Sequence, residues 1–398
     1  MIQKKTIREL CHIIGGNPSP KENEFSKEGI PFVKMMDLGR YHLTNNLIKV
    51  ENKISQDYAK FKSLKKIPKS SILLPRSGSV GLNHRAILGM DAFIVSHICA
   101  LNIIDNHIVH NNYLYYYLSS IDMVSITKQT TGLDAITFED LGKINIPLPP
   151  LETQKKIAAI LDKADELRQN DKKILEKFDR LAQSIFLEMF GDPVMNEKGW
   201  GKLSLGEIAS EIKYGTNAKS FDNCQEGSIP VIRIPNINFG YVNFRDLKYS
   251  TLPKKELENV RLKKGDLLFV RSNGNPDFIG RCAMFNSDFD AVFASYLIRV
   301  KVNRNISLRP DFIAYHINYK SFRRRVIREA RTTAGNYNLN TAGLRSFELI
   351  IPPIELQNRF ATIIEKVENQ KELSQQNLQK SEDLFQSLLQ RAFKGELV

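Results

Sequence analysis

The stretch IPLPPLETQKKIAAILDKADEL at Ile146–Leu167 joins a short apolar run to an amphipathic pattern through two adjacent prolines. A related stretch, LIIPPIELQNRFATIIEKVENQ, occupies Leu349–Gln370 and begins 203 residues later. Proline suits the first turn of a helix because the N–H that it lacks would have no partner there. Each stretch therefore predicts a strand that ends at the prolines and a long helix that begins after them.

Four further pairs of segments match upstream of these junctions, in the same order. The pairs are Gly29–Leu38 with Ser228–Ile237, Ile67–Gly81 with Leu262–Gly280, Asn112–Leu118 with Asp311–Ile317, and Thr130–Leu141 with Thr333–Leu344. The identities are few, but several matches in one register are not expected by chance. The sequence therefore predicts a tandem repeat with about 200 residues in each copy.

Each copy has the pattern of a compact, strand-rich domain. Runs such as SILLP, AFIVSHICALNII and VFASYLIRVKV alternate with Gly, Asn and Pro turns. One short helix is expected in each copy, at Asn111–Ile121 and at Pro310–Ala330. The expected fold class is therefore α+β.

After each proline pair the apolar residues follow the 3-4 spacing of a coiled coil. The predicted seam of the first helix is Ile157, Ile160, Ala164, Leu167, Ile174, Phe178, Leu181 and Ile185. The predicted seam of the second is Phe360, Ile363, Val367, Leu384 and Leu388, with polar residues in the middle. The sequences FGDP and FKGEL end the helices. Each helix is expected to have about 40 residues and a length of roughly 60 Å.

The order domain, helix, domain, helix predicts that the two helices pair as an antiparallel coiled coil and separate two similar domains. The expected boundaries are 1–148 and 193–351 for the two domains, and 149–192 and 352–398 for the two helical spacers. The alternative is that each helix packs separately on its own domain.

Composition indicates a nucleic-acid partner, because the chain has a formal net charge of +13 and a pI near 9.4. The four cysteines lie far apart and form no CxxC pair, which argues against a zinc module and favours free thiols. The N-terminus has no apolar signal segment, and no run of 18 apolar residues occurs. We therefore expect a cytoplasmic protein.

Motifs of the common enzyme classes are missing from the sequence. There is no GxxxxGK[ST] and no glycine-rich dinucleotide turn. The proline pairs lack the Asn or Asp that precedes them in adenine methyltransferases. His107 and His110 form an HxxH, but scattered histidines more commonly have structural roles than bind metal. We expect no catalytic residue, metal site or cofactor in this chain.

Polar side chains suited to DNA contact gather near the ends of predicted strands. The candidates are Arg76, Ser77, Asn83, Arg85, His97 and Thr131 in the first copy, and Lys219, Arg233, Arg271, Ser272, Asn273, Asn275, Arg281, Tyr296, Asn336 and Asn338 in the second. Arginine can bind guanine, and asparagine adenine, through paired hydrogen bonds. The alternative for the two loops at 76–85 and 271–281 is a tight turn that needs glycine.

Three more candidates lie on the helix predicted at Pro310–Ala330 and just after it. Arg324, Arg328 and Arg331 would share one helix face, which suits contact with phosphates. A solvated basic face is the alternative.

The PPLETQ and PPIELQ signals, the heptad helices and the FGDP ending resemble those of the specificity subunit of type I restriction-modification enzymes. The resemblance covers essentially the whole chain. The signal residues are Pro149, Pro150, Leu151, Glu152 and Gln154 in the first copy, and Pro352, Pro353, Ile354, Glu355 and Gln357 in the second. Thr153 and Leu356 stand where the family usually has Glu.

The resemblance implies a non-catalytic subunit with two target-recognition domains, each of which binds one half of an asymmetric bipartite DNA site. It implies that the helices set the spacer and dock two modification (methyltransferase) subunits that use S-adenosylmethionine. Restriction subunits that use ATP and Mg²⁺ would join them. Glu152, Gln154, Glu355, Gln357 and the seam residues would pair the helices and dock these partners. The competing interpretation is a coiled-coil scaffold with two globular heads that does not bind DNA.

Overall fold

The structure is a computed structural model that describes residues 3–41, 46–78, 80–126, 128–130, 133–333 and 336–397. It divides into two compact units. Unit 1 consists of residues 1–173 and 375–398, and unit 2 consists of residues 174–374. Each unit therefore combines one strand-rich domain with part of both long helices.

The domain of unit 1 contains two central sheets. The first has the order β2 (Cys11–Gly15), β8 (Ile98–Ile103), β5 (Ile72–Pro75) and β6 (Ala86–Ile87). The second has the order β4 (Lys53–Ile54), β3 (Ile30–Val33) and β7 (Phe93–Ile94). β1 (Gln3–Thr6) pairs antiparallel with β11 (Asn145–Leu148), and this pair brings the start of the domain to the helix junction.

The domain of unit 2 repeats this topology. Its larger sheet has the order β13 (Ala209–Tyr214), β21 (Leu297–Val302), β17 (Leu267–Val270), β19 (Cys282–Met284) and β15 (Gly240–Tyr241). Its smaller sheet has the order β16 (Lys248–Ser250), β14 (Ile229–Ile232) and β20 (Val292–Phe293). β12 (Gly201–Ser204) pairs with β24 (Glu348–Ile351). The predicted repeat and the α+β class are confirmed.

The short helices differ between the two domains. α4 (Asn111–Ser120) lies where the sequence predicts it. The single helix predicted at Pro310–Ala330 is wrong, because the chain forms α9 (Pro310–Asn318) and α10 (Lys320–Glu329). Tyr319 separates them with an extended backbone, and its side chain is buried in the core. Packing of this ring therefore outweighs the local preference for a continuous helix.

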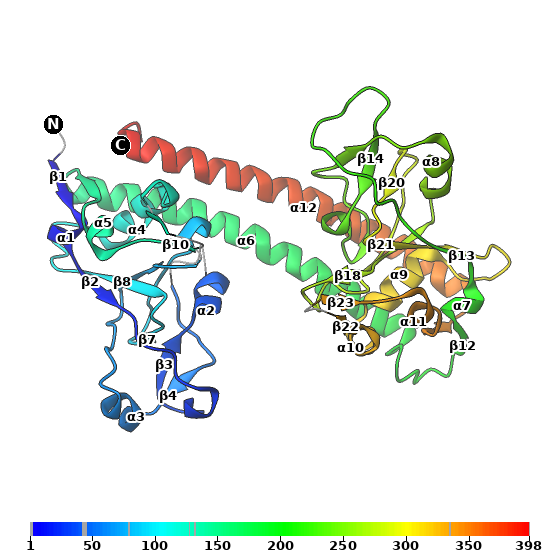
Figure 1. Cartoon of the computed structure of the whole chain (residues 1–398), viewed down its shortest axis with the longest axis horizontal. Coiled ribbons are helices and arrows are strands. Elements are labelled where there is room, and N and C mark those ends of the chain that lie inside the picture. The colour runs from blue at the N-terminus through cyan, green and yellow to red at the C-terminus, as the bar shows by residue number, and fades with distance from the viewer. Residues whose placement is uncertain are drawn as a thin grey trace. The chain divides into compact units, whose positions relative to one another are not determined.

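The two long helices are α6 (Leu151–Phe190) and α12 (Ile354–Lys394). In unit 1, Leu161 near the start of α6 shares a core with Phe385 and Leu389 near the end of α12. In unit 2, Phe186 near the end of α6 shares a core with Phe360 near the start of α12. The expected antiparallel pairing is confirmed, and in each unit the two helices run side by side (Figure 1).

The predicted seam is partly wrong. Ile157 and Val367 are buried, whereas Ile160 and Leu388 are only half-buried. Five predicted seam residues are exposed, with exposed fractions between 37% and 48%: Leu167, Ile174, Leu181, Ile363 and Leu384. The next residue is buried in four of these five places, namely Arg168, Ala182, Ile364 and Phe385. The buried face is therefore displaced by one residue there, and it includes polar as well as apolar side chains.

Charged residues occupy some of the buried positions between the long helices. In unit 1, Arg168 pairs with Asp165, and its guanidinium carbon lies 4.4 Å from the ring centre of Phe385 on α12. In unit 2, buried Lys371 of α12 pairs with Asp179 of α6. The Lys371–Asp179 pair joins the two helices, so it fixes their register in unit 2, because a shifted register would leave the buried amine without its partner.

Candidate nucleic-acid interface

In unit 1, Arg76, Ser77 and His97 lie together where β5 ends, and we call this group the strand-end site. The backbone N–H of Arg76 donates to the carbonyl of His97 at 2.7 Å, and the carbonyl of Arg76 accepts from the N–H of Ile136 at 2.9 Å. These two bonds fix the backbone of Arg76 while its side chain stays exposed. The guanidinium carbon lies 4.8 Å from the ring centre of Phe138.

Two predicted neighbours complete this site. Ser77 Oγ and His97 Nδ1 are 2.7 Å apart and share a hydrogen bond. His97 is exposed, so its ring and the Arg76 guanidinium both face solvent beside the end of β5. The sequence placed these three residues in two separate segments, and the fold brings them together.

The strand-end site of unit 2 has the same backbone anchors. The N–H of Arg271 donates to the carbonyl of Tyr296 at 2.8 Å, and the carbonyl of Arg271 accepts from Leu339 at 2.8 Å. The guanidinium carbon of Arg271 lies 4.5 Å from the ring centre of Tyr214. Tyr296 occupies the place that His97 has in unit 1 and is 62% exposed.

A small sheet extends the site of unit 2. β18 (Ser272–Asn273) pairs with β23 (Asn336–Asn338), which also pairs with β22 (Arg331–Thr333). Asn336 is exposed and Asn338 half-buried, so the predicted polar residues of the two segments lie together. Each strand-end site therefore offers an anchored guanidinium, polar donors and an aromatic or imidazole ring, which can contact base edges and phosphates.

The loop after β18 supports the tight-turn alternative for its asparagines. The side-chain oxygen of Asn273 accepts from the N–H of Asn275 at 2.8 Å, and that of Asn275 accepts from the N–H of Asp277 at 2.9 Å. Asparagine commonly stabilises turns in this way. Both side chains therefore shape the loop, and their amide groups keep only part of their hydrogen-bonding capacity for a ligand.

Two predicted contacts of unit 1 are corrected. Arg85 is 1% exposed, and its Nε donates to the carbonyl of Asn83 at 3.3 Å. Burial lowers the pKa of Arg85 to about 9. Asn83 is half-buried with φ of 50°, and its Nδ2 donates to the carbonyl of Ile121 at 3.3 Å. Both residues hold the loop on the core, so Arg85 is not available to DNA at the surface.

The remaining candidates of unit 2 have mixed positions. Lys219 is exposed, whereas Arg233 is half-buried and donates from Nη2 to the carbonyl of Asp246 at 3.0 Å. Arg324 and Arg328 are exposed on α10. Arg331 begins β22, so the prediction that it continues the helix is wrong. Thr131 and the side chain of Arg331 lie outside the residues that the structure describes.

The signal residues Gln154 and Gln357 have a role that the sequence did not indicate. Gln154 is 1% exposed, donates from Nε2 to the carbonyls of Ile108 and Pro149, and accepts from the N–H of His110. Gln357 is fully buried and makes the same three bonds, with Ser307, Pro352 and Arg309. These side chains fasten each helix start to its own domain, so they do not face a docking partner.

The acidic residues of the two signals stay at the surface. Glu152 and Glu355 are exposed, and Glu152 pairs with Lys155 at 2.8 Å. Their predicted part in docking therefore remains a prediction.

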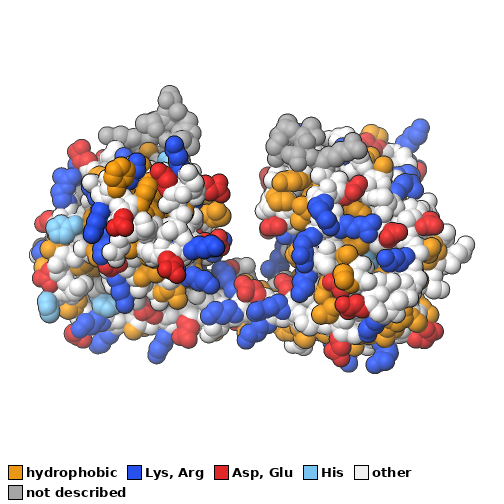
Figure 2. All heavy atoms as spheres, turned by 90° about the horizontal axis from the view of Figure 1, so that it is seen from below, with side chains coloured by type: hydrophobic (Ala, Val, Ile, Leu, Met, Phe, Trp, Pro, Cys, Tyr) orange, Lys and Arg blue, Asp and Glu red, His pale blue; other side chains and the backbone are white. Residues whose placement is uncertain are grey.

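Charge by itself does not locate the interface. On the face drawn in Figure 2, lysine and arginine side chains are mixed with acidic and apolar ones in each unit, and several basic side chains group on unit 2. Within the described part of the chain, no helix is both long and apolar enough to span a membrane. The anchored strand-end sites identify the candidate interface better than net charge does.

Comparisons with known proteins agree with the repeated architecture. A model of the type I restriction modification DNA specificity domain matches residues 2–180 and again residues 197–382. The crystal structure of a type I restriction-modification S subunit from M. genitalium aligns with 98% of this chain and 96% of its own, at a TM-score of 0.53 and 17% identity. That structure supports the fold.

Curated relatives carry the same description. The specificity subunit of the type I restriction enzyme EcoKI from Escherichia coli is 26% identical over 74% of this chain. The corresponding MjaIX subunit of Methanocaldococcus jannaschii is 29% identical over 58% of this chain. The matched regions span 66% and 57% of the lengths of these relatives. Since the family model covers most of the sequence in two copies, the chain belongs to the type I restriction-modification DNA specificity family.

Proposed function

We propose that this chain is the non-catalytic DNA-recognition subunit of a type I restriction-modification enzyme, and that each unit binds one half of an asymmetric bipartite site. The observation that carries the proposal is the duplicated strand-end site. Arg76 and Arg271 have equivalent backbone anchors, but their neighbours are Ser77 and His97 in one unit and Ser272 and Tyr296 in the other. Equivalent positions with different side chains suit two half-sites of different sequence.

The chemistry of this proposal belongs to partner subunits. Two modification subunits would methylate adenine with S-adenosylmethionine, and two restriction subunits would use ATP and Mg²⁺. The exposed residues Ile174 and Leu181 are seven residues apart on the part of α6 in unit 2 and so lie along one helix face. This apolar face supports docking of the modification subunits on the helices, whose length would set the spacer between half-sites.

Substitution of one anchored arginine tests the proposal. In complex with its modification subunits, Arg76→Ala should relax base preference in one half-site, and Arg271→Ala should relax it in the other. A good arginine–guanine contact contributes about 1–3 kcal/mol of discrimination, which corresponds to roughly 5-fold to 150-fold. Sequencing of methylated adenines across a genome measures both half-sites at once.

Arg304→Ala is the matched control, because Arg304 is an exposed arginine of unit 2 that follows the last residue of β21, whereas Tyr296 of the strand-end site precedes its first residue. It should leave the methylation pattern unchanged. Equal changes in both half-sites after one substitution, or no change after either, would contradict the proposal.

A further inference from the structure

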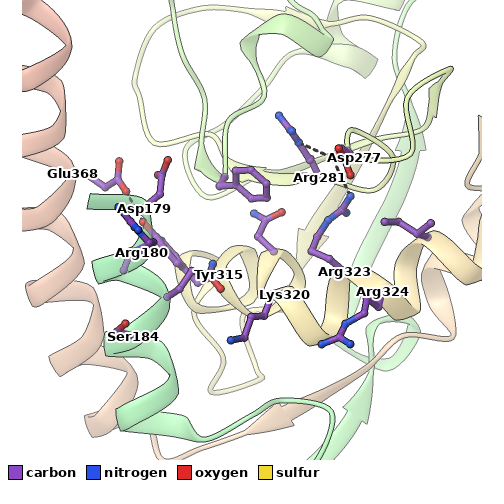
Figure 3. Close-up of a pocket in the computed structure, with 15 residues that line it drawn as sticks. Asp179, Arg180, Ser184, Asp277, Arg281, Tyr315, Lys320, Arg323, Arg324 and Glu368 are labelled. Atoms are coloured by element: carbon purple, nitrogen blue, oxygen red, sulfur yellow. Dashed lines mark hydrogen bonds between the residues drawn. The ribbon is translucent and has the colours of Figure 1, made fainter. Parts of the chain in front are cut away.

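A cavity of about 740 Å³ opens within unit 2, and Arg271 is not among the residues that line it. Its walls come from the second half of α6, from α9 and α10, and from the loop that precedes β19 (Figure 3). Five of the residues that line it are basic and three are acidic, so the cavity has an excess of positive charge. No residue of the predicted DNA contacts other than Arg281 and Arg324 lines it.

Arg281 lies on one side of this cavity, between two aromatic rings. Its guanidinium carbon is 3.9 Å from the ring centre of Phe278 and 4.6 Å from that of Phe239. Its Nε donates to the backbone carbonyl of Asp277 at 2.9 Å. The rings and the carbonyl hold the guanidinium in one orientation and leave its two terminal nitrogens for another acceptor.

Arg323 of α10 points toward the same carbonyl (Figure 3). It is 8% exposed, its Nη2 donates to Asp277 O at 3.2 Å, and its buried Nη1 has no hydrogen-bond partner among the described residues. Burial and the nearby charge of Arg281 lower the pKa of Arg323 to about 10. Two arginine side chains are therefore held close together in a poorly solvated place.

The loop can approach α10 this closely because of Gly280. Its φ is +62°, and a Cβ at this position would lie 2.3 Å from a side-chain carbon of Val326. A larger residue would push the loop and Arg281 away from the helix. The close pair of arginines is thus set by the backbone as well as by the side chains.

Acidic side chains around the cavity form no ion pair with these two arginines. Among the described residues, no carboxylate oxygen lies within 4.0 Å of Arg281 or Arg323. Glu368 accepts from the hydroxyl of Tyr315 at 2.6 Å, and Asp179 pairs with Lys371. The exposed carboxylate of Asp277, in the loop itself, attracts both guanidinium groups without forming an ion pair with either. Two like charges that share a partly desolvated site are unfavourable without a counter-ion.

We propose that this cavity is a phosphate-binding site in which Arg281 and Arg323 hold the anion and Phe239 and Tyr315 accommodate the attached organic group. An entering phosphate oxygen would supply the acceptor that Arg323 Nη1 lacks and would offset the repulsion between the two guanidinium groups. Lys320 and Arg324 also line the cavity, and their charges would add to its attraction for an anion. The phosphate could belong to a DNA strand or to a free nucleotide, and both sources offer the same group to the arginines.

Titration calorimetry on the full chain tests the site with three probes: inorganic phosphate, adenosine 5′-monophosphate and a DNA duplex of arbitrary sequence. Arg323→Met should weaken binding of at least one probe about tenfold or more, because it removes a charge-assisted contact while keeping the aliphatic packing. The variant should keep or raise the melting temperature, since it also removes a buried charge that has no counter-ion. Arg281→Met should weaken the same probe.

Arg325→Met is the matched control, because Arg325 lies on α10 outside the cavity, where it makes a long, 3.8 Å ion pair with Glu348 and its guanidinium carbon lies 6.0 Å from the ring centre of Phe322. It should leave the affinity of every probe nearly unchanged. Selective loss of duplex binding identifies DNA as the phosphate source, whereas selective loss of the small probes identifies a free nucleotide. Equal affinities for Arg323→Met and Arg325→Met with all three probes would overturn the proposal, whatever the methylation experiment gives.

Discussion

The strand pairs β5–β8 in unit 1 and β17–β21 in unit 2 have the same register but different chemistry at one buried position. In unit 1, Ala100 of β8 faces Leu73 of β5 and is fully buried in an apolar cluster. In unit 2 the equivalent residue of β21 is Arg299, which faces Leu268 of β17 and is 1% exposed. The same strand framework therefore accepts either a small apolar residue or a buried charge.

The partners of Arg299 explain how unit 2 tolerates this charge. Its Nη2 donates to Glu211 at 2.6 Å and to the carbonyl of Asn259 at 2.9 Å, and its Nη1 donates to the carbonyl of Arg261 at 2.8 Å. Buried Asp266 lies 3.9 Å away. The comparison teaches that the repeat preserves backbone pairing, whereas side-chain networks have diverged even in the core.

The largest loss of stability is expected when Arg299 is replaced and its partners remain. Arg299→Ala should lower the free energy of unfolding of the full chain by about 3–5 kcal/mol, because it leaves buried Asp266 without its counter-charge and two backbone carbonyls without this donor. Urea denaturation measures the loss. Lys255→Ala, at an exposed lysine of α8 (Lys254–Val260), is the control and should stay within about 0.5 kcal/mol of the wild type. A loss below about 1 kcal/mol for Arg299→Ala would show that the network contributes little.

A smaller loss of stability, equal in the two units, is expected at the starts of α6 and α12, where both units have the same hydrogen bonds. Gln154→Ala and Gln357→Ala should each cost about 1–3 kcal/mol, since each leaves buried backbone groups without a partner. The same denaturation experiment checks both variants, with exposed Lys156→Ala as the control. If only one glutamine proved important, the two junctions would differ in spite of their matching hydrogen bonds.

The smallest effect on stability is expected from Glu211, the acidic partner of Arg299, and this effect depends on pH. Burial opposes ionisation of Glu211, but hydrogen bonds from Lys213 and Arg299 outweigh it and hold the pKa of the carboxyl at about 2. Because the folded-state pKa lies below the ordinary value of 4.5, this stabilisation is present above pH 4.5 and is lost as the pH falls toward about 2.

Melting temperatures of the wild type and Glu211→Gln measure this contribution. The variant should melt lower at neutral pH, and the difference should shrink by about pH 3. A difference that stays constant with pH would mean that the carboxyl charge is not responsible. Unit 1 has His12 at the equivalent place on β2, so no matching acidic effect is expected there.

Much of the architecture could be predicted from local patterns. Proline pairs at Pro149–Pro150 and Pro352–Pro353 fix backbone angles directly, so both helix starts lie close to the predicted places. The order of matching segments predicted the repeat, and α4 agrees with its expected bounds. These features depend on residues that are close together in the sequence, so the sequence of one chain is enough to predict them.

The sequence by itself determined the two copies, their strand-rich class and the antiparallel helices, because these follow from periodicity, proline and order along the chain. Only the tertiary structure decided that Leu181 is exposed, that Arg85 is buried, and that Arg323 lies against Arg281. The reason is physical: an arginine is stable inside or outside according to the carbonyls, carboxylates and rings that distant segments bring to it. Local spacing does not contain that information.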